Sequence, residues 1–158
     1  MREDRSAEEL SRAIYGTVLA TALIAAYSED PGSDPLQVAA ATAVTAIVFW
    51  IAHAYAGLVA RGGHSAEGLA AAREELASQW PLVLGAMPPT VPLLLGPLGV
   101  LSGYHAEIAA IVTGIVVLGA WGTLLPLRRG RGPVSILFGA IASAVFGLAV
   151  ITLKALVH

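Results

Sequence analysis

The chain has 158 residues, of which 56% are hydrophobic and 13% are charged. Ordinary soluble domains carry about 25% charged residues, so this composition excludes a soluble domain. The net charge of -2 comes with no basic block and no aromatic platform, which excludes nucleic acid as a partner. The sequence has no cysteine, and disulfides and thiolate metal sites are therefore excluded.

Apolar stretches of spanning length follow one another along the chain. A helix needs about 20 apolar residues to cross a hydrocarbon core of about 30 Å. We therefore expect one integral membrane domain over residues 1–158, an all-α polytopic helix bundle in contact with the lipid bilayer. The expected spans cover about residues 7–27, 35–61, 81–101, 104–126 and 133–157.

Capping signals set the expected starts of the first two spans. Ser6 and Glu9 have the spacing of a capping box, which predicts a helix from about Ala7. The acidic residues before it are unlike the positive start of a signal peptide, so we expect a retained span. Asp34 followed by Pro35 is typical of a helix start, and it predicts the beginning of the second span.

Residues 66–80 are expected to form an amphipathic helix on the cytoplasmic membrane surface. One side of this helix is apolar and carries Leu69, Ala72, Leu76 and Trp80. The other side is charged, and we expect it to face water; it carries Glu67, Arg73, Glu74 and Glu75. This segment is therefore predicted to lie on the bilayer and not to cross it.

The third span, residues 81–101, holds four more prolines after Pro81, each of which removes a helical hydrogen bond. Pro88 and Pro89 lie near its midpoint, and we expect the helix to be broken there. Broken helices at mid-membrane can offer backbone groups to a transported substrate, and a plain kink is the alternative. The sequence leaves open whether this span is one kinked helix or two half-helices.

The distribution of Lys and Arg predicts the orientation, because loops kept in the cytoplasm are enriched in them. With five spans and a cytoplasmic N-terminus, eight of the nine basic residues fall on the cytoplasmic side. These eight are Arg2, Arg5, Arg12, Arg61, Arg73, Arg128, Arg129 and Arg131. We therefore expect a multi-pass protein of the bacterial plasma membrane with its C-terminus outside.

Two groups of polar residues are expected at membrane depth, where ionisable side chains are costly. His53 lies with Trp50 in the inner part of the second span, either as a titrating group on an ion path or as a structural histidine bonded to a neighbour. Glu107 and Lys154 share the outer level with His105. Three interpretations of this group are open: an outer vestibule, a cation site formed with nearby carboxylates, or an ion pair between Glu107 and Lys154. The spacing of these residues is not that of metal ligands, so we expect no metal site.

Small residues recur every four positions in the last span, at Gly139, Ser143 and Gly147. Such a face lets two helices approach closely, either within one chain or between the chains of a homo-oligomer. The sequence shows no nucleophile paired with a base and no phosphate-binding loop. We expect neither enzymatic activity nor a cofactor.

Three stretches carry a resemblance over most of the chain, namely FWIAHAYA at residues 49–56, WPLVLGAMPPTVPLLLG at 80–96 and LKALVH at 153–158. They resemble a group of small actinobacterial integral membrane proteins, a resemblance that gives no residue a role. The first two spans also look faintly like lysosomal-type potassium channels, which would place Arg12, Trp50 and His53 at matching positions. The R-x-x-x-F-S-D signature of those channels has Gly16-Thr17-Val18 here instead of F-S-D.

Two functions fit these features. The first is an oligomeric unit that conducts or transports ions or protons, because five thin spans alone enclose little space for a path. The alternative is a non-catalytic scaffold or accessory subunit whose surface helix, residues 66–80, binds a partner protein.

Overall fold

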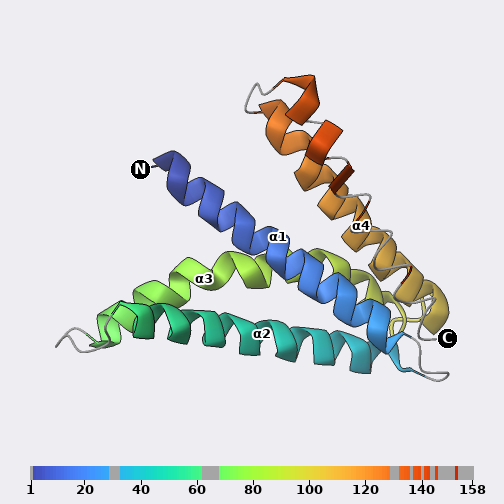
Figure 1. Cartoon of the computed structure of the whole chain (residues 1–158). Coiled ribbons are helices and arrows are strands. Elements are labelled where there is room, and N and C mark those ends of the chain that lie inside the picture. Colours follow the sequence, from blue (N-terminus) through green and yellow to red (C-terminus); the bar gives the residue numbers. More distant parts are fainter. Residues whose placement is uncertain are drawn as a thin grey trace.

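The computed structural model describes residues 2–28, 33–61, 68–128, 132–135, 137–139, 141–142, 145 and 152. These residues form helices and turns without strands, so the predicted all-α class is confirmed. The elements in chain order are α1 (Arg2–Tyr27), α2 (Pro35–Ala60), α3 (Gly68–Thr90), the short 3-10 helix η1 (Val91–Leu95) and α4 (Gly103–Arg128), as Figure 1 shows.

Three helical segments are long and apolar enough to cross a membrane, Ser6–Tyr27, Pro35–Ala60 and Gly103–Thr123. Their length and composition are those of a membrane protein. Much of the span expected over 133–157 lies outside the described residues.

The start of α2 was predicted correctly from the sequence, and the start of α1 was not. The carboxylate of Asp34 accepts the backbone N–H of Leu36 at 3.0 Å, and Pro35 occupies the first turn, as predicted. The capping-box prediction was wrong, because α1 begins at Arg2. The residues before Ser6 include two acids, Glu3 and Asp4, and negative side chains favour a helix N-terminus.

The third helix joins two segments that the sequence analysis separated. α3 runs without interruption through Pro81, Pro88 and Pro89, so neither the separate surface helix nor the break at residues 88–89 is present. The α-helix ends at Thr90, where η1 continues the chain. The two expected elements therefore form one continuous helix that is followed by a short 3-10 helix (Figure 1).

A donor from another helix replaces the hydrogen bond that Pro89 removes from α3. Pro89 has no N–H to donate to the Gly85 carbonyl, which instead accepts the hydroxyl of Thr17 from α1 at 2.7 Å. The carbonyls of Leu76 and Ser78, which flank the Ala77 carbonyl left by Pro81, accept the indole of Trp50 and the guanidinium of Arg12, each at 2.8 Å. Thr17 therefore replaces the donor lost at Pro89, and Trp50 and Arg12 tie α2 and α1 to the turn of α3 before Pro81.

Small residues bring α1 and α3 together at their crossing. A Cβ on Gly16 would overlap the Leu82 carbonyl, and a Cβ on Gly85 would overlap the Ala13 carbonyl. Glycine at both positions allows the two backbones to touch, as at other close crossings of membrane helices. This crossing fixes α3 against α1 in the middle of the bundle.

The bundle is tightly packed at one end and open at the other. At the packed end, Ile24, Val38, Leu93 and Ala110 form an apolar core from four elements. At the other end α1 and α4 diverge, as Figure 1 shows. The diverging end contains the start of α1 and the end of α4, so it is the Arg-rich end expected to face the cytoplasm.

Candidate functional site

A buried carboxylate lies where α3 packs on the last turns of α2. The side chain of Glu75 is 3% exposed, and its Oε1 accepts the Gln79 amide at 3.1 Å and the Ser78 hydroxyl at 3.4 Å. Gly57 of α2 makes room for it, because a Cβ at that position would meet the carboxylate. The local fold therefore places a charged group inside the helix contact.

Arg61 supplies the countercharge to this carboxylate. Its Nη2 lies 2.7 Å from Glu75 Oε2, which accepts no hydrogen bond from the described residues. The guanidinium side chain is 65% exposed, so one partner of the pair is in the interior and the other is at the surface. A buried charge is costly unless it is paired. Here the carboxylate is buried in the contact between α2 and α3, and its arginine partner lies outside that contact.

Aromatic and basic side chains fix the same region of α3. The rings of Trp50 and Trp80 pack edge to face with their centroids 5.4 Å apart, which is a favourable geometry for two aromatic rings. The Trp50 indole also donates to the Leu76 carbonyl, and Arg12 donates to the Ser78 carbonyl. Side chains of α1 and α2 thus hold the turn that carries Glu75.

A hollow of about 400 Å³ lies between α1, α3 and α4 in the diverging half of the bundle. Its walls include Glu9, Thr17, Leu84, Pro88 and Trp121. Pro88 has no N–H to donate to the Leu84 carbonyl. The Nε1 of Trp121 is buried and has no hydrogen-bond partner in the described part of the chain.

His53 lies on an exposed face of α2 and not inside the bundle. Its Nδ1 is 2.8 Å from the Phe49 carbonyl, an acceptor, so the ring proton of this bond is on Nδ1. Its ring also contacts Tyr15 of α1 with centroids 5.5 Å apart. These contacts match the structural alternative for His53.

Glu107 and His105 are described among the residues expected at the outer membrane level, but Lys154 is not. Glu107 is 5% exposed and accepts the Ser33 hydroxyl at 2.6 Å. His105 is exposed, with its Nδ1 2.7 Å from the Ser102 hydroxyl. Lys154, the expected partner of Glu107, lies outside the described residues.

The small-residue face of the last span is described at one position. A Cβ on Gly139 would overlap the carbonyl of Gly122, so this glycine packs against α4 of its own chain. Ser143 and Gly147 lie outside the described residues. The close contact at Gly139 is therefore intramolecular.

Glu75 and Gln79 were missed as site residues, because Glu75 stands in the run Arg73-Glu74-Glu75 that was predicted to face water. The structure corrects this for Glu75, which is only 2% exposed. A signal was present in the spacing. Glu75 and Gln79 continue the stripe of Leu82 and Ala86, which are separated from them by helical steps of three and four residues.

Comparison with models of protein families, with curated proteins and with solved structures gives no match. Among the described residues, no group of three or more His, Asp or Glu side chains is placed to hold a metal ion.

Proposed function

We propose that the chain is a membrane transport unit that moves protons or small cations and works as a homo-oligomer. The observation that carries the proposal is the hollow between α1, α3 and α4, whose wall contains the proline turn of α3. The hollow lies in the Arg-rich half, and the apolar core around Leu93 fills the other half. A cavity confined to one half of the bundle is expected for a transport path that opens to one side of the membrane.

The hollow is lined mainly by apolar side chains, and its few polar groups favour water and cations. The Leu84 carbonyl, which Pro88 deprives of its helical donor, presents a partial negative charge, and Glu9 adds a carboxylate. The buried N–H of Trp121 needs an acceptor, and a water molecule in the hollow would supply it. A hydrated cation or a proton carried by water matches both requirements.

Flux across liposomes tests this function. Purified protein reconstituted at known density should carry protons, K⁺ or Na⁺ faster than protein-free liposomes. Leu84→Trp should reduce that flux by about tenfold or more, because the larger ring fills the hollow. Leu36→Trp is the matched control, since both leucines are 49% exposed and Leu36 lies on α2, away from the hollow.

A scaffold function is the second candidate, and the uncovered apolar face of α2 favours it. Only 11% of the best spanning window of α2 is buried within the chain. A partner helix could cover this face in the membrane. Folded protein that gives no flux above protein-free liposomes for any of these ions would favour the scaffold and contradict transport.

A further inference from the structure

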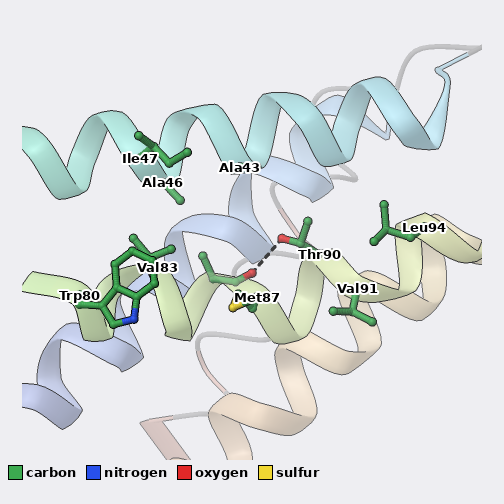
Figure 2. Close-up of a pocket in the computed structure, with 10 residues that line it drawn as sticks. Ala43, Ala46, Ile47, Trp80, Val83, Met87, Thr90, Val91 and Leu94 are labelled. Atoms are coloured by element: carbon green, nitrogen blue, oxygen red, sulfur yellow. Dashed lines mark hydrogen bonds between the residues drawn. The ribbon is translucent and has the colours of Figure 1, made fainter.

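An apolar groove of about 280 Å³ runs between α2 and α3, separate from the hollow (Figure 2). Ala43 and Ile47 line it from α2, and Trp80, Val83 and Met87 line it from α3. Thr90 also borders the groove, but its hydroxyl donates to the Ala86 carbonyl at 2.8 Å. The groove therefore suits a hydrocarbon chain better than a polar ligand.

The groove lies beside the apolar surface that α2 presents to its surroundings. Val44, Val48 and Ile51 of α2 are each more than half exposed. Exposed apolar side chains on a spanning helix face lipid tails. An acyl chain can therefore enter the groove from the bilayer.

Two arginines lie at one end of this groove, together with the acidic residues Glu74 and Glu75. Arg73 precedes Trp80 by seven residues on the same face of α3, which is about 10 Å along the helix axis. Arg61 ends α2 at the same level, with its side chain 65% exposed beyond Glu75. The described residues at the other end of the groove, 33–36 and 91–104, contain no Lys or Arg.

We propose that this groove binds one acyl chain of an anionic phospholipid from the cytoplasmic leaflet, with the phosphate at Arg73 and Arg61. Arg73 lies about 10 Å along the helix axis from Trp80, and the headgroup and glycerol of the lipid would bridge this spacing. Basic sites between helices on the cytoplasmic side are a recurring form of anionic-lipid recognition. The charge at one end selects the headgroup, and the apolar groove holds the tail.

Native mass spectrometry of the full chain in detergent tests the tail contact, with phosphatidylglycerol and phosphatidylcholine as probes. Ala43→Phe places a ring in the groove from an exposed position. Ala52→Phe is the matched control, because Ala52 is also exposed and lies nine residues along α2, on the opposite face. The wild type and Ala52→Phe should retain one phosphatidylglycerol, and Ala43→Phe should retain at least tenfold less.

The headgroup contact is tested by charge removal. The wild type should prefer phosphatidylglycerol to phosphatidylcholine by about tenfold, and Arg73→Gln should abolish most of that preference. Arg5→Gln, on α1, should leave it unchanged. Equal binding of the two lipids by the wild type, or full retention by Ala43→Phe, would overturn the proposal. A dimer that Ala43→Phe dissociates would also overturn it, because a second copy would then cover the groove.

Discussion

Glu75 and Arg61 form an ion pair whose two ends have different surroundings. Removing Arg61 leaves a buried carboxylate without its countercharge, whereas removing Glu75 leaves an arginine that can turn to water. We predict that Arg61→Gln lowers the free energy of unfolding by about 1 kcal/mol, a modest value because this partner is exposed. Thermal unfolding in detergent measures the change.

The double variant separates this charge effect from lost packing. Glu75→Gln removes the charge and keeps the size of the side chain, so Arg61→Gln/Glu75→Gln should be more stable than Arg61→Gln alone. Additive losses in this cycle would show that the two charges are not coupled.

The indole N–H of Trp50 links α2 to the turn of α3 that precedes Pro81. Trp50→Phe keeps a ring in place and removes the bond to the Leu76 carbonyl, so we predict a loss of about 1 kcal/mol in stability. Trp80→Phe is the control, since its side chain makes no hydrogen bond in the described part of the chain. Equal melting temperatures for Trp50→Phe and wild type would contradict this role.

The sequence pointed to several polar residues but could not say what each contacts. Trp50 was chosen as a candidate and does make an interhelical hydrogen bond, while His53, expected either on an ion path or as a structural histidine, lies on an exposed face of α2 and bonds to the Phe49 carbonyl. Glu75 was missed because its burial depends on the rotation of α3. That rotation follows from contacts with Gly57 and α1, which are distant in the sequence.

At the scale of elements, the α1–α3 crossing depends on the absence of side chains at two positions. Gly85→Ala would place a methyl group against the Ala13 backbone, and overpacking of this kind costs roughly 1 to 3 kcal/mol. We predict a corresponding drop in thermal stability in detergent.

Gly119→Ala is the control for that experiment. No atom of the described residues lies within 4 Å of a Cβ at Gly119, so the methyl group should be tolerated, and its better helix propensity should add up to about 1 kcal/mol. If Gly85→Ala and Gly119→Ala unfold at the same temperature, the close crossing is wrong.

The element boundaries show which signals are local. The start of α2 was predicted because Asp34 and Pro35 act on neighbouring backbone groups. The uninterrupted course of α3 was not predicted, because it depends on hydrogen-bond donors on other helices, such as Thr17. A rule that considers only the prolines of one segment takes no account of such donors.

At the scale of the whole molecule, the helices run alternately between a packed end and a diverging end (Figure 1). We predict that the diverging, Arg-rich end faces the cytoplasm. The natural absence of cysteine gives a clean test with single substitutions in sealed cells. Ser102→Cys should react with an impermeant reagent from outside, and Gly68→Cys should react only after the cells are opened. Reaction of both from the same side would contradict the alternation.

The accessibility of the hollow to water tests the central claim most directly. Leu84→Cys should react with a charged thiosulfonate reagent added at the Arg-rich side of a sealed membrane, because the hollow is predicted to hold water. Val48→Cys is the control, since Val48 is 56% exposed on α2 and should face lipid, where the reagent cannot reach. If Leu84→Cys is as inert as Val48→Cys from both sides, the hollow is filled by lipid or protein, and the proposed path does not exist.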